Sequence, residues 1–293
     1  MIDTLQNKGI IPNGNYELIE LKGGTTSGRV YLIVGEEKFI LKYDQPIGIG
    51  IVDHFYNTYG TIYLFPRVYA VDMEEGWILY EYTDGTTHTN RGQKSEWMKI
   101  LVTRVLNQYK PSDPQAPWGR VGGEPRSAWS DFNRKSLEYA YENVGDLLSN
   151  EDYSRMESFV EELAMYDANE LKYYLHGDTG VHNFVFQNEC LAGVIDPSPM
   201  VGPILYDFTY AFCSSPDDLT VEALLSSFEL LESVQMETSR LIKEVVFQLY
   251  TRIGICKQAH PHDLDAYLEA WAYWRGLLDA CQKTTVSQGD LNV

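Results

Sequence analysis

The first eighty residues of the chain alternate between hydrophobic and polar side chains with the two-residue period of β-strands. Segments with this period, rich in β-branched and aromatic residues, occupy residues 16–21, 29–34, 38–43, 65–72 and 76–82. Glycines between the segments indicate turns, and residues 48–60 predict at most a weak helix. This part of the chain is therefore expected to form a five-stranded antiparallel sheet with one helix.

After residue 84 the alternation is replaced by the apolar spacing of helices. Helices are predicted at residues 95–109, 149–164, 217–235, 237–258 and 263–282. Residues 110–128, rich in proline and glycine, predict a loop, and Ser149 and Asp152 have the spacing of a capping box. The pattern predicts an α+β fold with a small N-terminal β lobe, residues 1–84, and a larger, mainly helical lobe, residues 85–293.

Polar side chains interrupt a hydrophobic stretch at residues 174–186, YLHGDTGVHNFVF. Strand-like residues precede His176 and follow Asn183, and a short turn leads to a second strand that ends at Asp196. Two neighbouring strands would bring Asp178, Asn183 and Asp196 to one edge. An amide and a carboxylate are oxygen ligands that suit Mg²⁺, and Asp178 is then free to accept a proton from a hydroxyl. This division of roles is that of phosphoryl transfer.

The N-terminal lobe offers residues that could bind a nucleotide. GGTTSG at residues 23–28 joins the first two predicted strands, and such a glycine-containing backbone can lie close over phosphate groups. Lys42, on the third strand, is placed to neutralise phosphate oxygens, and the backbone after the fifth strand could pair with an adenine edge. The candidate nucleotide-binding residues are Gly24, Thr25, Thr26, Ser27, Lys42, Glu81, Tyr82 and Thr83.

Taken in order, the segments GGTTSG, FILKYD, YEYTDG, HGDTGVHN, IDP and GPILYDFTYAF resemble those of the aminoglycoside phosphotransferase and choline kinase family. The resemblance covers roughly residues 16–283. It implies a two-lobed protein-kinase-like fold and a small-molecule kinase that uses Mg²⁺ and takes phosphate from ATP or GTP. HGDxxxxN followed by a strand ending in IDP is the specific part of the match.

The same resemblance implies roles for individual residues. Asp178 would be the catalytic base, Asn183 and Asp196 would hold Mg²⁺, and Lys42 would contact the nucleotide phosphates. The residues expected to support the catalytic loop by hydrogen bonds are His176 and Asp207.

One expected ion pair is not obvious in this chain. Kinases of this fold usually pair the strand lysine with a glutamate on the helix that follows. Here Asp53 is the only acid between Asp44 and Asp72. Either Asp53 is the partner of Lys42, or the pairing is made differently in this chain.

Two features separate the chain from protein kinases. Gly177 stands where those enzymes have an arginine that reads phosphate on the activation loop. Only ten residues separate Asp196 from Asp207, which is too few for a peptide-binding activation segment. The acceptor is therefore expected to be a small molecule rather than a protein.

The acceptor is expected to be a hydroxyl of a cationic molecule bound by the helical lobe. Acids that could bind a polyamine sugar are Asp217, Asp218, Glu222, Asp263 and Glu269. The same acids could be solvated, or lie at helix starts where the helix dipole stabilises them. Tyr267, Trp271 and Trp274, at helical spacing, could hold a quaternary ammonium group such as choline by cation–π contact, or could pack in the core.

The leading hypothesis is an aminoglycoside-type O-phosphotransferase. Choline, ethanolamine, homoserine, methylthioribose and macrolides are alternative acceptors. A nucleotide-binding scaffold without turnover is the alternative from another class. No pattern indicates an oligomeric state, a choice between ATP and GTP, or a role in antibiotic resistance as opposed to metabolism.

Charge and cysteine content narrow the range of partners. The formal net charge of −19 argues against a nucleic-acid partner, because phosphate binding needs a basic surface. It argues against an anionic membrane surface for the same reason. The four widely spaced cysteines indicate reduced, mostly buried thiols, and the N-terminus lacks the features of a secretory signal, so a cytoplasmic location is expected.

Overall fold

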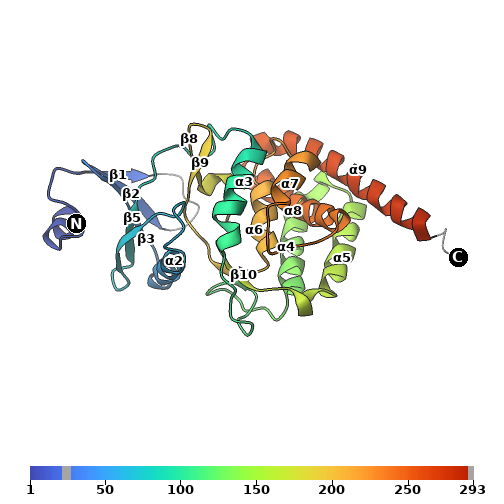
Figure 1. The fold of residues 1–293 in the computed structure, drawn as a ribbon, viewed down its shortest axis with the longest axis horizontal. Helices are drawn as coiled ribbons and strands as arrows, with labels where there is room; N and C mark the ends of the chain where they lie inside the picture. Colours follow the sequence, from blue (N-terminus) through green and yellow to red (C-terminus); the bar gives the residue numbers. More distant parts are fainter. Residues whose placement is uncertain (22–27, 290–293) are drawn as a thin grey trace.

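The computed structural model describes residues 1–21 and 28–289, and Figure 1 shows a sheet at the N-terminal end and a group of helices beyond it. The strands of this sheet are β1 (Glu17–Leu21), β2 (Arg29–Val34), β3 (Lys38–Tyr43), β4 (Val68–Asp72) and β5 (Trp77–Glu81). They lie in the order β1-β2-β3-β5-β4, and each neighbouring pair is antiparallel. The predicted five-stranded antiparallel sheet is confirmed.

Two helices accompany the sheet, α1 (Ile2–Asn7) and α2 (Pro46–Thr58). The sequence does not predict α1, and α2 is a full helix of 13 residues rather than a weak one. Its first residue is Pro46, whose fixed φ suits the first helical position. The buried residues of α2, among them Phe55 and Tyr56, pack on the face of the sheet that carries Ile40.

The alternation of β3 sends its side chains to two different environments. Phe39 and Leu41 pack with Leu5 of α1 in a small core of their own. Ile40 belongs to the large core that continues into the helical lobe. Because successive side chains point to opposite faces, Lys42 lies on the same face as Ile40 and is directed toward the helical lobe.

The connection between the lobes is attached to the larger one. After β5 the chain reaches Gly85 and Thr86, and Thr86 exchanges two backbone hydrogen bonds with Phe186, at 2.9 and 2.8 Å. A side chain at Gly85 would meet the Phe186 carbonyl at 2.5 Å, and the φ of Gly85 is +146°. Glycine is therefore required where the connection crosses this strand. The predicted lobe boundary, residue 84, falls in this connection.

The larger lobe is mainly helical. Its helices are α3 (Lys94–Arg104), α4 (Trp129–Val144), α5 (Asn150–Ala164), α6 (Ile204–Phe212), α7 (Val221–Phe228), α8 (Thr238–Ala259) and α9 (Leu264–Gly289). Single 3₁₀ turns are η1 (Leu106–Gln108), η2 (Gly145–Leu147), η3 (Asp167–Asn169), η4 (Val181–Asn183) and η5 (Pro261–Asp263). The predicted fold class is confirmed, although α4 was not predicted and the helix expected at 217–235 is confined to α7. Within residues 1–21 and 28–289 no helix is long and apolar enough to cross a membrane.

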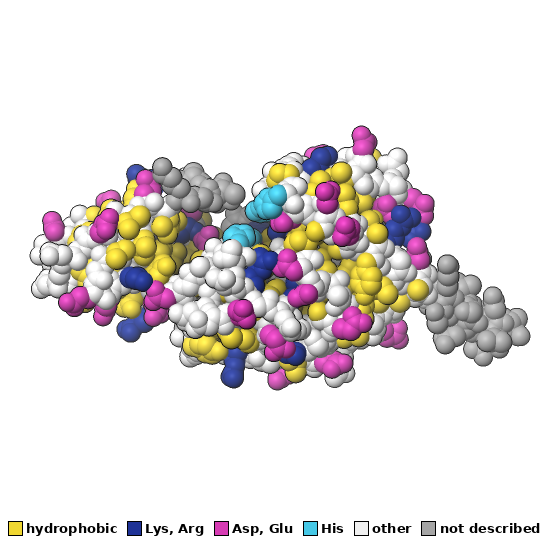
Figure 2. All heavy atoms as spheres, turned by 90° about the horizontal axis from the view of Figure 1, so that it is seen from above, with side chains coloured by type: hydrophobic (Ala, Val, Ile, Leu, Met, Phe, Trp, Pro, Cys, Tyr) yellow, Lys and Arg dark blue, Asp and Glu magenta, His cyan; other side chains and the backbone are white. Residues whose placement is uncertain are grey.

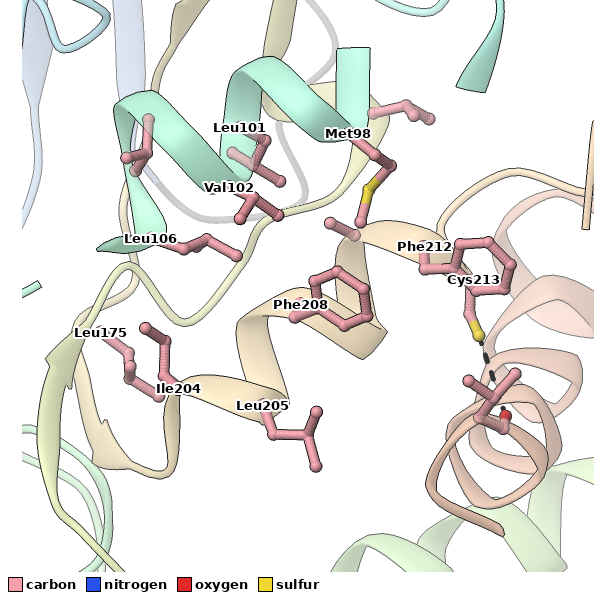
Figure 3. Close-up of a cluster of buried hydrophobic side chains, with 14 of the residues drawn as sticks. Met98, Leu101, Val102, Leu106, Leu175, Ile204, Leu205, Phe208, Phe212 and Cys213 are labelled. Atoms are coloured by element: carbon pink, nitrogen blue, oxygen red, sulfur yellow. Dashed lines mark hydrogen bonds between the residues drawn. The ribbon is translucent and has the colours of Figure 1, made fainter. Parts of the chain in front are cut away.

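The helix α6 is held in place by a buried hydrophobic cluster (Figure 3). Met98, Leu101 and Val102 of α3 face α6 across this cluster. The side chains that α6 contributes are Ile204, Leu205 and Phe208, and all six are buried. This packing fixes the position of Asp207, which lies on α6 between two of the cluster residues.

Short strands in the larger lobe place the loop of residues 176–183. β8 (Phe184–Gln187) and β9 (Cys190–Val194) form an antiparallel hairpin. Its two turn residues, Asn188 and Glu189, have φ values of 50° and 63°, as the favoured two-residue hairpin turn requires. β7 (Tyr173–Leu175) pairs with β10 (Met200–Gly202), and β6 (Gly119–Arg120) pairs with the other side of β10. The hairpin predicted from the sequence is confirmed.

Replacement of Ser149 by alanine is expected to lower the free energy of unfolding by about 1 kcal/mol. The Ser149 hydroxyl accepts from the Asp152 N–H at 3.2 Å, and the Asp152 carboxylate accepts from the Ser149 N–H at 3.0 Å. The change removes one half of this capping box. Urea denaturation followed by circular dichroism measures the effect. Ser158→Ala, on the exposed side of the same helix, is the control, and equal losses in the two variants would contradict the capping role.

Candidate active site

His176 holds the start of the loop of residues 176–183 in place. It is fully buried, and its Nε2 lies 3.0 Å from the Ile195 carbonyl while its Nδ1 accepts from the Asp178 N–H at 3.3 Å. Burial lowers the pKa of His176 to about 4, so the ring is neutral at pH 7. A neutral ring with the proton on Nε2 satisfies both contacts. His176 therefore ties the loop to the strand end at Asp196.

Asp207 holds the same loop from the side of α6. Its carboxylate accepts from the Gly177 N–H at 3.0 and 3.2 Å and from the Tyr109 hydroxyl at 2.7 Å. Its main-chain carbonyl accepts from the Thr179 hydroxyl at 2.7 Å. Burial raises the pKa of Asp207 to about 6, although the bonds from Tyr109 and Gly177 act in the opposite direction. Asp207 thus contacts loop backbone, as the sequence predicts.

Gly177 has a backbone conformation that other residues rarely adopt. Its φ is +78°, and a Cβ atom there would collide with the Ser198 carbonyl and lie 2.6 Å from Nη1 of Arg120. Arg120 donates from Nη1 to the carbonyls of Gly177 and Ser198, both at 2.7 Å. Arg120 lies in residues 110–128, which the sequence predicts to be a loop, and no pattern there indicates this role.

Asp178 lies at the centre of the loop with its carboxylate partly exposed, at 27% of the side chain. Its Oδ2 accepts from Nδ2 of Asn183 at 2.9 Å and lies 3.2 Å from Nε2 of His182. Burial raises the pKa of Asp178, but the hydrogen bond and charge of His182, aided by His176 and the Tyr210 hydroxyl, outweigh it and hold the pKa well below its usual range. Asp178 is therefore ionised at neutral pH.

The Asn183 amide and the Asp196 carboxylate could hold a magnesium ion. Nδ2 of Asn183 donates to the Asp178 carbonyl at 3.0 Å and lies 3.5 Å from the Asp196 carbonyl, which brings the two residues together. The amide oxygen of Asn183 has no hydrogen bond to any described residue, and the side chain of Asp196 is 50% exposed. An amide oxygen and a half-exposed carboxylate are ligands that fit Mg²⁺, which usually keeps waters and phosphate oxygens in its shell.

Lys42 pairs with Asp196 and not with Asp53. Its Nζ contacts Oδ1 of Asp196, and the lysine is 8% exposed. Within residues 1–21 and 28–289 there is no salt bridge between Lys42 and Asp53, so of the two alternatives the pairing is made differently. From α2 the buried Tyr56 approaches Asp196 instead, and burial, followed by the charges of Tyr80 and Asp196, raises the pKa of Tyr56 well above 10.

The predicted nucleotide-binding residues are only partly described. Gly24, Thr25, Thr26 and Ser27 lie outside the described residues. The N–H of Glu81 donates to the Arg67 carbonyl at 2.9 Å, and that of Tyr82 donates to the Lys38 carbonyl at 3.4 Å, so both are already used in the sheet. The Thr83 N–H has no partner among the described residues. Thr83 is therefore the one of the three whose N–H is left for a ligand.

The sequence model of a phosphotransferase enzyme family matches residues 19–237. The chain belongs to this phosphotransferase family. No curated protein sequence matches the chain significantly. The predicted resemblance and the prediction of a phosphotransferase enzyme are confirmed.

Solved structures share the fold over nearly their full lengths. A putative aminoglycoside phosphotransferase from Ralstonia eutropha has a TM-score of 0.63 at 13% identity and covers 94% of this chain and 97% of its own. Choline kinase LicA from Streptococcus pneumoniae has a TM-score of 0.59 at 14% identity, with 95% and 97% covered. The ADP-bound aminoglycoside phosphotransferase APH(2'')-Ib has a TM-score of 0.55 at 16% identity, with 93% and 97% covered.

The acids predicted to bind a cationic acceptor have different partners in this phosphotransferase, or are exposed. Asp217 forms an ion pair with Arg91, and Asp218 accepts from the Lys94 N–H at 3.3 Å. Asp263 lies 3.7 Å from Nε2 of His262. The remaining two, Glu222 and Glu269, are exposed on helices. These acids are thus paired or exposed in the structure, and their binding of an acceptor stays a prediction.

The aromatic residues predicted as a possible choline site are core residues of the phosphotransferase. Tyr267, Trp271 and Trp274 are 1%, 5% and 0% exposed. The indole N–H of Trp274 donates to the Leu219 carbonyl at 2.9 Å, and the Tyr267 hydroxyl donates to the Cys213 carbonyl at 3.0 Å. The core-packing alternative is correct, because these rings leave no open face for a ligand.

Proposed function

We propose that the chain transfers the γ-phosphate of ATP or GTP to a hydroxyl group of a small molecule, with Mg²⁺ as cofactor. One observation carries this proposal. Asp178, ionised and partly exposed, is hydrogen-bonded to Asn183, and Asn183 lies beside Asp196, whose carboxylate pairs with Lys42. The proposed base, the two proposed metal ligands and the lysine proposed to bind phosphate thus lie together at the junction of the two lobes. This is the set that phosphoryl transfer requires.

Each residue has one task in this proposal. When bound, Mg²⁺ would neutralise charge on the nucleotide phosphates, and Asn183 and Asp196 would hold it. Lys42 would contact the same phosphates. Asp178 would orient the acceptor hydroxyl and accept its proton as the phosphoryl group is transferred. His176 and Asp207 keep Asp178 in position through the loop backbone, and catalysis would come mainly from positioning and electrostatics.

The fold neighbours support a nucleotide donor and a small acceptor. One of them, aminoglycoside phosphotransferase APH(4)-Ia, was crystallised in a ternary complex with ADP and hygromycin B, and its TM-score is 0.53 at 19% identity. An aminoglycoside-type O-phosphotransferase, the leading hypothesis from the sequence, agrees with this neighbour.

The first experiment measures ADP or GDP release by the purified protein with Mg²⁺. The acceptors to compare are aminoglycosides, macrolides, choline, ethanolamine, homoserine and methylthioribose. Release that depends on one acceptor class would establish the reaction. If the protein bound neither ATP nor GTP in a separate binding measurement, the proposed function would be wrong.

Replacement of Asp196 by alanine is expected to weaken the binding of Mg²⁺–nucleotide at least tenfold, because a direct metal ligand and the partner of Lys42 are both lost. Isothermal titration calorimetry with and without EDTA measures this. The difference between wild type and variant should be small when EDTA is present. Asp146→Ala, at an exposed position, is the control. Unchanged Mg²⁺-dependent affinity in Asp196→Ala would exclude Asp196 as a metal ligand.

A further inference from the structure

Arg252 is a buried cation without an acidic partner. It lies on α8 and is 6% exposed. Its Nε donates to the Tyr267 hydroxyl at 3.2 Å and its Nη2 to the Ser214 carbonyl at 3.0 Å. Within residues 1–21 and 28–289 no aspartate or glutamate forms a salt bridge with it. Buried charges are normally paired, because removing an ion from water is costly unless an opposite charge replaces the solvent.

Three histidines, His88, His182 and His260, form with Arg252 a group that is here called the basic region, and His88 is its exposed member. His88, from the connection between the lobes, lies 6.3 Å from the ring of His182 and 6.2 Å from that of His260, measured between ring centres. Burial and then His182 lower the pKa of His88, and burial and then Arg252 lower that of His260. Figure 2 shows histidine side chains beside basic ones between the two lobes.

The nearby acids do not neutralise this group of residues. Asp217 is already paired with Arg91, and Asp178 is held by His182 and Asn183. Asp263 raises the pKa of His260, but less than burial and Arg252 lower it. A buried arginine with no acidic partner among the described residues, beside three histidines, is unexpected in a chain of net charge −19.

The basic region lies next to the proposed catalytic base. His182 contacts Asp178 directly and lies ring to ring with His88. Ser214 joins Arg252 to the loop of residues 176–183. Its Oγ accepts from the Val181 N–H at 3.2 Å, and its main-chain carbonyl accepts from Nη2 of Arg252 at 3.0 Å. Burial raises the pKa of Tyr210, Asp178 raises it further, and Arg252 lowers it, which agrees with this arrangement. Arg252 therefore lies beside the loop that carries Asp178.

We propose that the acceptor carries an anionic oxygen group, a carboxylate or a phosphate ester, that binds Arg252 and the adjoining histidines while its hydroxyl lies at Asp178. The planar guanidinium suits both groups, because it can donate two parallel hydrogen bonds to them. This inference rests on the proposed phosphotransferase function and replaces the expectation of a cationic acceptor.

The test uses the full chain saturated with Mg²⁺ and a non-hydrolysable ATP analogue, so that phosphate-binding groups of the nucleotide site are occupied. Binding of gluconate, glucose 6-phosphate, glucose and glucamine is compared by calorimetry at constant ionic strength. These probes share a six-carbon polyol and differ in charge. A comparison of gluconate with glucose 6-phosphate shows whether the site prefers a carboxylate or a phosphate. We expect one or both anions to bind at least about tenfold more tightly than glucose and glucamine.

Variants connect the preference to the residues. Arg252→Gln should weaken binding of the anion at least about tenfold and leave binding of glucose unchanged. His88→Gln, at an exposed position, should weaken it by a smaller factor and keeps the test valid if Arg252→Gln does not fold. Arg134→Gln, on an exposed part of α4, should change nothing. Equal binding of all four probes, tighter binding of glucamine, or anion binding that survives both variants would overturn the inference. Phosphate transfer to a cationic acceptor would overturn it while leaving the proposed function intact.

Discussion

Replacement of Asp178 by asparagine should abolish phosphate transfer, lowering kcat by about a thousandfold or more. The substitution keeps the shape of the side chain but removes the negative charge that accepts the acceptor's proton. The amide would also face Nδ2 of Asn183, which donates to Oδ2 of Asp178 at 2.9 Å, so the two side chains would compete in orientation. Because the residue contacts no nucleotide phosphate in the proposed arrangement, nucleotide affinity should change less than about threefold.

The pH dependence adds a second check on Asp178. Its pKa is lowered from 3.8, so the carboxylate stays ionised from pH 9 down to below pH 4. A loss of activity between pH 7 and pH 5 would therefore come from another group. The measurement is kcat for wild type across this range, with Asp178→Asn at each pH and Asp146→Asn as the control. Near-normal turnover by Asp178→Asn would show that another residue is the base.

The fold could be predicted where one face of an element is apolar and the other polar. The strands of the N-terminal sheet are predictable from short β-branched and aromatic runs that end at turns, although β3 is apolar on both faces. The helix α4 does not have one apolar and one polar face, because its buried side includes Ser130 and Asn133 beside Trp129, Leu137 and Ala140. Polar residues at core positions hide the helical period, so the sequence shows no clear apolar stripe. The buried surface of α4 becomes visible only once its neighbours in the lobe are known.

The start of α7 illustrates a different limit. The predicted helix begins at residue 217, but Asp218 has a φ of 50°, which a helix cannot contain. The Thr220 hydroxyl then caps the true helix by accepting from the Ala223 N–H at 3.2 Å. The carboxylate of Asp218 accepts a hydrogen bond from the Lys94 N–H at 3.3 Å. This contact joins residues far apart in the chain, so the left-handed conformation of Asp218 cannot be predicted from the local sequence.

In the candidate site, residues that are close in sequence could be predicted, and residues brought together by tertiary packing could not. Asp178, Asn183 and Asp196 belong to one hairpin and its flanks, so the spacing along the chain predicts that they meet. Arg252 lies in an otherwise apolar stretch of α8, where an isolated arginine gives no signal. The pairing of Lys42 with Asp196 joins residues 154 positions apart, and only the packing of one lobe on the other brings it about.

Replacement of Gly177 by alanine is expected to lower kcat at least about a hundredfold and to destabilise the protein by more than about 2 kcal/mol. The cost has two parts. An L-residue at φ +78° is strained, and the new Cβ would collide with the Ser198 carbonyl and lie 3.0 Å from Cγ of Met200. Relief of this collision requires the loop to shift, and the next residue in the loop is Asp178. A displacement of about 1 Å there is enough to misplace the acceptor hydroxyl.

The matched control for Gly177→Ala is Gly276→Ala. Gly276 lies within α9, and a Cβ atom there would meet no atom within 4 Å. Alanine should therefore leave kcat unchanged and stabilise the helix by up to about 1 kcal/mol. Steady-state kinetics and urea denaturation of both variants give the comparison. Full activity in Gly177→Ala would mean that the loop tolerates a side chain at this position, and that the hydrogen bond from the Gly177 N–H to Asp207 does not fix the geometry of Asp178.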